Sequence, residues 1–337
     1  MKPTRLKVGV VGVGHLGAHH ARIYASLPGV ELVGVHDRDP RRAQAVAAAL
    51  DCRTFAGARE LGHAVEALSI AVPARAHAEV ALPCLERGVA VLIEKPMADS
   101  VEAARALRDA AAASGAPLMV GHVERWNGAF RKLRDRIHRP RFVEGHRLSS
   151  FVGRGLDVDV IFDLMIHDLD LVASFSTAEL RQVAAIGVPV LTTSADIANV
   201  RLEFADGLVA NLTASRVSRE RLRKLRIFQE DAYFSIDFAA RTAEVVTRSP
   251  DGDLALEEPP AGADPGGRLR HELIDAREEP EPLAAEIEAS VEAVRGGRTP
   301  EPGAEEGLRA VDLAERVTKE MAVAAQRWSA PELARGA

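Results

Sequence analysis

A glycine-rich turn near the start of the chain constrains the fold more than any other feature. Residues Val8–Val13 are mostly apolar and predict a buried strand, and Gly12, Gly14 and Gly17 fit the spacing G-x-G-x-x-G. An amphipathic segment follows at 18–27. In this arrangement the first glycine permits a tight turn, the second lets the backbone approach a pyrophosphate, and the third lets a helix pack closely on the strand.

A second strand and an acidic residue complete the pattern. Residues Val30–Val35 predict another buried strand, which ends at His36-Asp37. Asp37 lies 20 residues beyond Gly17, where a carboxylate can accept hydrogen bonds from an adenosine ribose. The helix between the strands directs free N–H groups and its positive dipole end at an anion. This order favours a dinucleotide site over a purely structural glycine-rich turn.

Arg38, which follows Asp37, leaves the choice between NAD and NADP to be tested by experiment. Asp37 favours NAD, because it accepts a hydrogen bond from the ribose 2′-hydroxyl and repels a 2′-phosphate. Arg38 favours NADP, since a guanidinium pairs with that phosphate. We expect NAD. The cofactor contacts expected in and after the turn are Gly12, Gly14, His15, Leu16, Gly17, Asp37 and Arg38.

Composition excludes several classes of function. The 337 residues suggest two domains, and a net charge of −6 gives no field that recruits nucleic acid or an anionic membrane. No apolar run approaches the ~20 residues of a membrane-spanning helix. The N-terminal residues show no signal-peptide pattern, and Cys52 and Cys84 form no C-x-x-C pair. We therefore expect a cytoplasmic protein with free thiols and no metal site.

Up to about residue 121, apolar strands alternate with helical stretches. The expected strands are 8–13, 30–35, 67–72, 90–93 and 118–120, and the expected helices are 15–27, 40–50, 75–87 and 100–114. This alternation predicts a doubly wound parallel sheet covered on both faces. Ligands bind such sheets outside the carboxyl ends of the strands, so Val72-Pro73 and Glu94-Lys95-Pro96 should face the same crevice as Gly14.

After residue 121 the pattern changes to several strands in succession. Helices are expected at 127–137, 160–174, 282–295 and 304–328, and strands at 142–151, 181–188, 198–204, 208–215, 224–229, 233–238 and 242–247. Asp206-Gly207 is a hairpin signal, and residues 252–267 predict an exposed loop. The chain is thus predicted to be α/β, with a Rossmann domain at 1–121 and a second domain at 122–337 built on an open, mainly antiparallel sheet.

Two groups of side chains suggest acid–base chemistry. Lys95 follows a buried strand at the crevice, where it can bind a substrate hydroxyl or relay a proton, or merely end the strand. Asp163 and His167 are four residues apart and share one helix face. The carboxylate can orient the imidazole as a base. The alternative is a half-buried histidine beside surface acids.

Three other segments have competing interpretations. The junction carries His122, Arg125, Trp126 and Asn127, which suit a hydroxylated ligand and a sugar ring but also suit a linker with helix caps. His15 and His19 have metal-ligand spacing without further ligands. The basic run at 216–226 predicts a solvated face or an oligomer rim, with a substrate diphosphate as the alternative.

These motifs together resemble the glucose-fructose oxidoreductase/inositol dehydrogenase (Gfo/Idh/MocA) family. The matching residues are Gly12-Val-Gly-His-Leu-Gly17, Val72-Pro73 with His77, Glu94-Lys95-Pro96, and Asp163 with His167. The resemblance implies NAD(P)-dependent oxidation or reduction at a sugar carbon and a homodimer or homotetramer formed through the C-terminal sheet. It implies Lys95, Asp163 and His167 as catalytic residues, and it adds Val72, Pro73, His77, Glu94 and Lys95 to the cofactor contacts.

Residues 120–127 and 162–170 resemble one subgroup of that family more closely. This subgroup oxidises the 3-hydroxyl of UDP-N-acetylglucosamine in lipid A precursor synthesis. Its usual Arg-Phe-Asn-Pro is Arg125-Trp126-Asn127-Gly128 here, which keeps the polar residues. The resemblance implies a nucleotide-sugar substrate in contact with Lys95, Asp163 and His167 and with the residues of the junction. A cyclitol dehydrogenase, a carbonyl or imine reductase, and a noncatalytic dinucleotide sensor are the alternatives.

Overall fold

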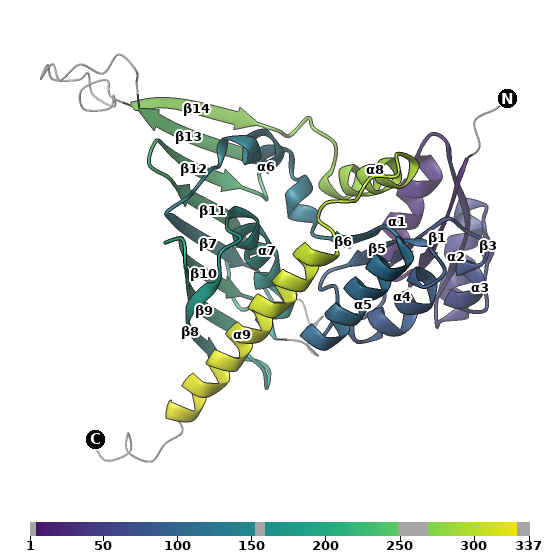
Figure 1. Cartoon of the computed structure of the whole chain (residues 1–337), viewed down its shortest axis with the longest axis horizontal. Coiled ribbons are helices and arrows are strands. Elements are labelled where there is room, and N and C mark those ends of the chain that lie inside the picture. The colour runs from purple at the N-terminus through teal and green to yellow at the C-terminus, as the bar shows by residue number, and fades with distance from the viewer. Residues whose placement is uncertain (1–4, 152–158, 249–268, 329–337) are drawn as a thin grey trace, which may run out of the picture. The chain divides into compact units, whose positions relative to one another are not determined.

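The computed structural model describes residues 5–151, 159–248 and 269–328 (Figure 1). The chain forms two compact units. The first consists of Met1–Trp126 with Pro280–Glu315, and the second of Asn127–Glu279 with Arg316–Ala337. Both units combine a sheet with helices, so the predicted α/β class is confirmed. The functional division of the chain after residue 121 stays a prediction.

The first unit is built on a parallel sheet with the strand order β3-β2-β1-β4-β5-β6. Its strands are β1 (Leu6–Val11), β2 (Val30–His36), β3 (Arg53–Thr54), β4 (Ala67–Ile70), β5 (Ala90–Glu94) and β6 (Leu118–Gly121). Every residue of β4, β5 and β6 is buried, as expected for central strands covered on both faces. The predicted Rossmann arrangement is confirmed.

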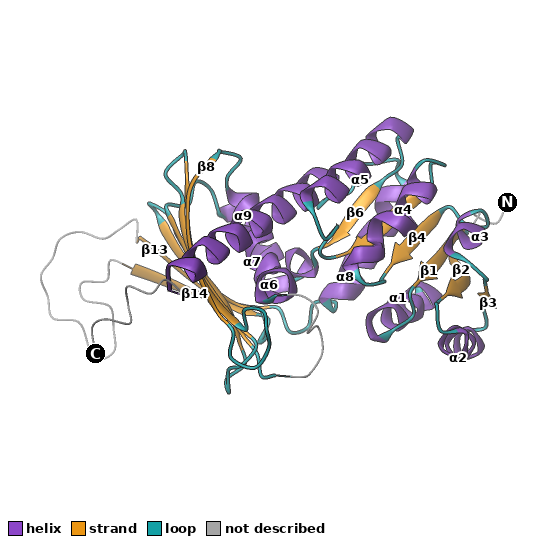
Figure 2. Ribbon diagram, turned by 90° about the horizontal axis from the view of Figure 1, so that it is seen from below, coloured by secondary structure: helices purple, strands orange, loops and turns teal. Residues whose placement is uncertain are grey.

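Helices cover both faces of this sheet (Figure 2). They are α1 (His15–Ser26), α2 (Pro40–Leu50), α3 (Ala58–Gly62), α4 (His77–Leu85), α5 (Val101–Ser114) and α8 (Pro282–Arg295). Local chemistry fixes several starts: the side chain of Asp39 caps α2 with Pro40 at the first position, and Ser100 caps α5. The sequence predicted neither β3 nor α3, because elements of two and five residues are too short for a periodic pattern.

The second unit is built on a mixed sheet with the strand order β14-β13-β12-β11-β7-β10-β9-β8. Its strands are β7 (Phe142–Leu148), β8 (Leu180–Val188), β9 (Ile197–Phe204), β10 (Val209–Ser215), β11 (Leu222–Phe228), β12 (Ala232–Asp237), β13 (Thr242–Arg248) and β14 (Leu269–Asp275). Only β7 and β10 pair in parallel among these described strands. The predicted open, mainly antiparallel sheet is confirmed.

One face of the second sheet carries helices α6 (Gly128–Leu133) and α7 (Ile166–Phe175), as Figure 2 shows. Buried residues alternate with half-buried or exposed ones along β7 and β9 and along most of β10, which is the pattern of a sheet with one covered face. The predicted hairpin at Asp206-Gly207 is present, with Gly207 at φ +90° between β9 and β10. The last helix, α9 (Ala304–Trp328), begins in the first unit and ends in the second.

Three features of this unit differ from the sequence expectations or lie outside the described residues. Strand β14 was not predicted, because charged residues interrupt its short apolar alternation. The helix expected from 160 to 174 begins with a π-helical turn, Ile161–Met165, before regular α7. The loop predicted at 252–267 lies outside the described residues.

Candidate active site

A cavity of about 460 Å³ lies at the glycine-rich turn, outside the carboxyl ends of β1, β2 and β4. Its lining includes Gly12, Gly14, Asp37, Arg38, Val72 and Pro73, which the sequence had assigned to the cofactor. It also includes Val11, His36, Arg42, Ala58, Ala71, Ala76 and Val80, which were not assigned. Of these, Arg42 stands in the first turn of α2, five residues after the acid, and that position is the signal that would have found it.

The three glycines of the turn differ in their backbone conformation and in the space around them. Gly12 has φ +82°, so it makes a turn that other residues resist. A β-carbon at Gly17 would lie 1.8 Å from the carbonyl oxygen of Gly12, so the helix needs glycine there to pack on the strand. A β-carbon at Gly14 would meet only Arg42 Nη1, at 3.7 Å. Gly14 therefore faces open space that suits a pyrophosphate.

The start of α1 offers backbone donors to that space. Gly14 is the N-cap residue and makes no side-chain cap, while His15 and Leu16 are exposed in the first turn. The free N–H groups of an uncapped helix start bind anions. The cavity, the open glycine and the helix start fit the diphosphate of a dinucleotide.

Asp37 is held in place by backbone groups. Its Oδ2 accepts the Val13 N–H at 2.8 Å, and its Oδ1 accepts the Asp39 N–H at 2.8 Å. Two arginines stand nearby: Arg42 Nη1 is 3.8 Å from Asp37 Oδ2, and the Arg38 side chain is 80% exposed and 3.9 Å from Glu79. Backbone donors thus fix the orientation of the carboxylate, while both arginine side chains are more than half exposed.

His77 occupies a different place from the other predicted cofactor contacts. Its ring is buried, with Nδ1 2.9 Å from the Pro96 carbonyl oxygen and Nε2 2.9 Å from the Val72 carbonyl oxygen. Burial lowers the pKa of His77 below the usual 6.5, although the three backbone carbonyls around it oppose that effect. The imidazole thus links the segments that follow β4 and β5 by hydrogen bonds.

Lys95 follows β5 directly and is half-buried, and its peptide bond to Pro96 is cis. The preceding side chain, Glu94, is buried within the unit, with Oε1 2.9 Å from His20 Nε2. Glu94 is therefore engaged by the protein itself. The role of Lys95 toward a ligand stays a prediction.

Asp163 and His167 lie in the second unit and are both half-buried. Asp163 stands in the π-helical turn and His167 at the start of α7. Asp159 precedes the turn, and its Oδ1 accepts the N–H groups of Ile161 at 2.9 Å and Phe162 at 3.1 Å. π-Helical turns are common at functional sites. That Asp163 and His167 act as an acid–base pair stays a prediction.

The junction segment divides into buried and partly accessible residues. His122 is buried, whereas Arg125 and Trp126 are half-buried, and Trp126 packs on the core of the first unit. Asn127 is buried and serves the scaffold: its Oδ1 accepts the Ala129 N–H at 3.2 Å and its Nδ2 donates to the Phe238 carbonyl at 3.0 Å. The capping alternative thus describes Asn127.

Three basic side chains of the run at 216–226 pair with carboxylates, those of Arg216, Lys224 and Arg226. Arg216 is buried and donates to Asp196 at 2.8 Å, while Arg226 pairs with Glu144 at 2.9 Å. His15 and His19 stack edge to face, with ring centroids 4.9 Å apart. Within residues 5–151, 159–248 and 269–328 no group of three metal-binding side chains occurs, and no helix is long and apolar enough to cross a bilayer.

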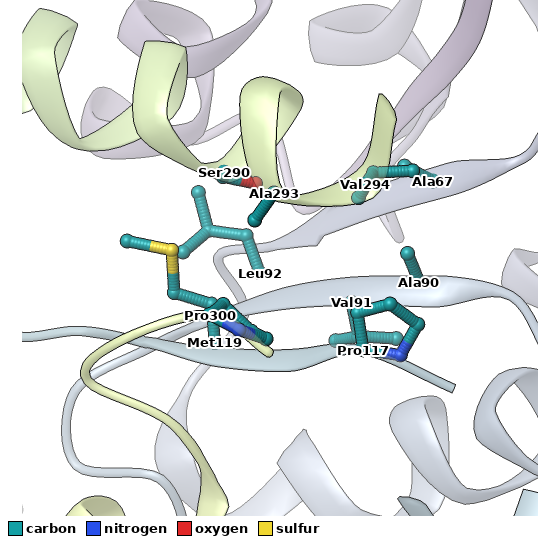
Figure 3. A pocket seen from close by; sticks show the side chains of 10 residues that line it. All are labelled: Ala67, Ala90, Val91, Leu92, Pro117, Met119, Ser290, Ala293, Val294 and Pro300. Atoms are coloured by element: carbon teal, nitrogen blue, oxygen red, sulfur yellow. The ribbon is translucent and has the colours of Figure 1, made fainter. Parts of the chain in front are cut away.

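A second, very small cavity lies beside α8 in the first unit. Figure 3 shows this space of about 10 Å³ between α8 and strands β4 to β6, lined by aliphatic side chains and Ser290. It is large enough for about one water molecule. It cannot hold a sugar or a nucleotide.

Family models match both halves of the chain. The model described as "Oxidoreductase family, NAD-binding Rossmann fold" matches residues 6–122. The GFO/IDH/MocA C-terminal domain matches residues 125–235. The two matches cover most of the chain.

Curated relatives include two kinds of dehydrogenase. The chain is 41% identical over 295 residues to the UDP-N-acetylglucosamine 3-dehydrogenase of Acidithiobacillus ferrooxidans, covering 87% of this chain and 90% of that one. It is 31% identical to the inositol 2-dehydrogenase of Rubrobacter xylanophilus, over 64% of this chain and 66% of the relative.

Solved structures with a similar fold include two dehydrogenases. The same Acidithiobacillus enzyme superposes with a TM-score of 0.86 at 39% identity, covering 94% of this chain and 97% of that one. A levoglucosan dehydrogenase in complex with NADH and levoglucosan shares the fold, with a TM-score of 0.80 at 18% identity, over 94% and 97% of the two chains. The glycine-rich turn, the fold of both units and the two family models agree: the chain belongs to the GFO/IDH/MocA family of oxidoreductases with an NAD-binding Rossmann fold.

Proposed function

We propose that this protein is an NAD-dependent dehydrogenase that oxidises the 3-hydroxyl of UDP-N-acetylglucosamine. The observation that carries the proposal is the 41% identity to a UDP-N-acetylglucosamine 3-dehydrogenase over 87% of this chain. The resemblance of residues 120–127 and 162–170 to that subgroup supports it. A reaction of this kind serves lipid A precursor synthesis.

The protein's own groups would handle the proton and the orientation of the sugar. NAD, when bound, accepts the hydride from the sugar carbon. His167 takes the proton of the hydroxyl, and Asp163 orients the imidazole. Lys95 donates a hydrogen bond to the same oxygen as it becomes a ketone. The roles of Lys95 and His167 can be exchanged.

Asp37 is the basis for proposing NAD over NADP. Its carboxylate is fixed by the Val13 and Asp39 amides and is suited to accept from the ribose 2′-hydroxyl. The same carboxylate would repel the 2′-phosphate of NADP. Arg38 and Arg42 are the residues that would have to offset that repulsion.

We propose His122, Arg125 and Trp126 as contacts of the sugar nucleotide, in addition to Lys95, Asp163 and His167. Asn127 is kept only as a residue that shapes the segment, because its amide caps α6. The free thiols of Cys52 and Cys84 are consistent with the cytoplasm as the proposed location.

The face of the second sheet opposite α6 and α7 is the proposed surface for a homodimer or homotetramer. Phe142, Phe228 and Tyr233 form a row of rings, with centroids 5.5 and 4.8 Å apart, and Leu273 of β14 is 83% exposed. Light scattering of the wild type and of Leu273→Asp tests this. An oligomer that the variant weakens is expected, and a monomeric wild type would refute it.

The activity test couples the reaction to an aminotransferase with glutamate, because the ketone is unfavourable at equilibrium. Mass spectrometry of the sugar nucleotide should show conversion of UDP-N-acetylglucosamine to an amine through a two-hydrogen loss. The relatives named inositol 2-dehydrogenase favour a cyclitol as the second candidate. NADH formation from myo-inositol without any change in the UDP-sugar would establish that alternative.

A further inference from the structure

A chain of hydrogen bonds lies inside the first unit and ends one residue before Lys95. Tyr24 Oη is 2.9 Å from Ser69 Oγ, Ser69 Oγ is 3.0 Å from His20 Nδ1, and His20 Nε2 is 2.9 Å from Glu94 Oε1. His20 and Ser69 are fully buried, Tyr24 is 1% exposed and Glu94 is 7% exposed. A buried carboxylate is stable only with such partners.

The carboxyl group of Glu94 is fixed on more than one side. Its Oε2 accepts the backbone N–H of Lys95 at 3.3 Å, while Oε1 contacts His20. On β6, a β-carbon at Gly121 would lie 3.1 Å from three atoms of this carboxyl group. Glycine at 121 therefore leaves the space that Glu94 occupies. The side chain lies against the turn through which Lys95 leaves the strand.

We propose that Glu94, held by His20, is a positioning residue that sets the direction and the charge of Lys95. This inference rests on the proposed role of Lys95 at the substrate hydroxyl. His20 stands three residues after Gly17 on α1, so the helix whose start faces the cofactor cavity also holds Glu94. One helix would thus align the anion site and the acid–base group.

The negative charge of Glu94 sets the direction in which the pKa of Lys95 should change when that charge is removed. The charged or titratable groups near this carboxylate are His20 of α1, His77 of α4, whose pKa it raises, and Lys95 itself. A neighbouring negative charge favours the ammonium form of a lysine. Glu94→Gln keeps the shape and an acceptor oxygen but removes that charge, so the pKa of Lys95 should fall.

Competitive amine labelling at a series of pH values, read by peptide mass spectrometry, measures this pKa without turnover. In the full chain, Glu94→Gln should lower it by about one unit. The same variant should lower kcat by about 10- to 100-fold, with KM for NAD changed less than about threefold. Tyr24→Phe is the control: it breaks the same chain away from Glu94 and should leave the pKa of Lys95 and kcat unchanged.

A double variant tests whether His20 acts through Glu94. His20→Leu should lower kcat, and adding it to Glu94→Gln should lower kcat by no more than about twofold further. An unchanged Lys95 pKa and kcat in Glu94→Gln would overturn the proposal, as would multiplicative effects in the double variant. No turnover of UDP-N-acetylglucosamine by the wild type would instead count against the proposed function, and the labelling result would still stand.

Discussion

Two buried carboxylates, one in each unit, are held by different partners. Glu94 precedes Lys95 and contacts the imidazole of His20 at 2.9 Å. Asp168 follows His167 and receives two hydrogen bonds from the Arg147 guanidinium, at 2.8 and 3.0 Å. The side chains of Arg147 and Asp168 are each 4% exposed. Each candidate acid–base residue is thus next in sequence to an internal anion.

The partners differ in how they respond to pH and to mutation. A guanidinium is charged at every accessible pH and binds a carboxylate with two parallel hydrogen bonds. An imidazole titrates near neutrality, and its hydrogen-bond roles can reverse. The second unit therefore fixes its helix to the sheet with a permanent pair. The first unit uses an imidazole in contact with the carboxylate that precedes Lys95.

The largest expected effect comes from the two acid–base residues themselves. Lys95→Ala and His167→Ala should each reduce kcat by ~10²–10⁴-fold, because general acid–base groups contribute that much. NAD affinity should stay nearly unchanged, since neither side chain is assigned to the adenosine end. Steady-state kinetics with an NADH-binding titration measure both quantities. A variant that keeps more than about a tenth of the wild-type kcat would remove its residue from the mechanism.

Breaking the Arg147–Asp168 ion pair should lower the free energy of unfolding more than breaking the His20–Glu94 contact. Arg147→Leu leaves the Asp168 charge buried, so we expect a loss of about 3–5 kcal/mol in the free energy of unfolding. The matched control is Arg226→Leu on the half-exposed pair with Glu144, which should cost about 0–1 kcal/mol. Urea unfolding of both variants gives the comparison. Equal losses of unfolding free energy in the two variants would show that burial does not make the Arg147–Asp168 pair more costly to break.

A third carboxylate, Asp37, is held by backbone amides in place of a cation. Asp37→Ala should narrow the preference for NAD over NADP by roughly tenfold, since one hydrogen bond to a charged group and one repulsion are lost. Values of kcat/KM with both cofactors measure it. A wild-type protein that prefers NADP would contradict the assigned role, and Arg42→Ala would then show which guanidinium binds the phosphate.

The last comparison concerns the different response of the two units to pH. In the first unit, burial raises the pKa of Tyr24 to about 12, despite its hydrogen bonds to Ser69 and Ser290. The folded state therefore holds this proton more tightly than the unfolded state does. The contribution of Tyr24 to the free energy of unfolding is fully present below pH 10. Between pH 10 and about 12 it should fall by roughly 1.4 kcal/mol per pH unit. Tyr24→Phe should flatten that slope.

In the second unit, the sign is reversed for Asp196. Burial alone would raise its pKa, but the N–H groups of Leu191 and Thr192 and the Arg216 guanidinium hold it well below the usual 3.8. This contribution is complete above pH 3.8 and is lost as the pH falls below it. In a Trp328→Phe background, Trp126 fluorescence follows the first unit. An alkaline slope identical in Tyr24→Phe and wild type would refute the contrast.

The sequence predicted what long periodic patterns and close-spaced motifs carry. The parallel sheet, its helices and the cofactor turn were predicted because apolar runs and glycine spacing are local signals. The π-helical turn before His167 was not, since its extra residue per turn leaves no distinctive pattern. Nor was the contact of His20 with Glu94, which joins residues 74 positions apart. Asn127 was assigned to a ligand because a cap and a polar contact use the same residue type.

The contrast between Gly17 and Gly14 bears on how genetic variation in this gene should be interpreted. Any side chain at Gly17 would collide with the Gly12 carbonyl, so every missense allele there damages the turn itself. Loss of function at that codon carries no information about the cofactor. At Gly14 a small side chain fits the apoprotein and fills the space beside the helix start. Alleles of codon 14 therefore separate a folding defect from a binding defect, which alleles of codon 17 cannot do.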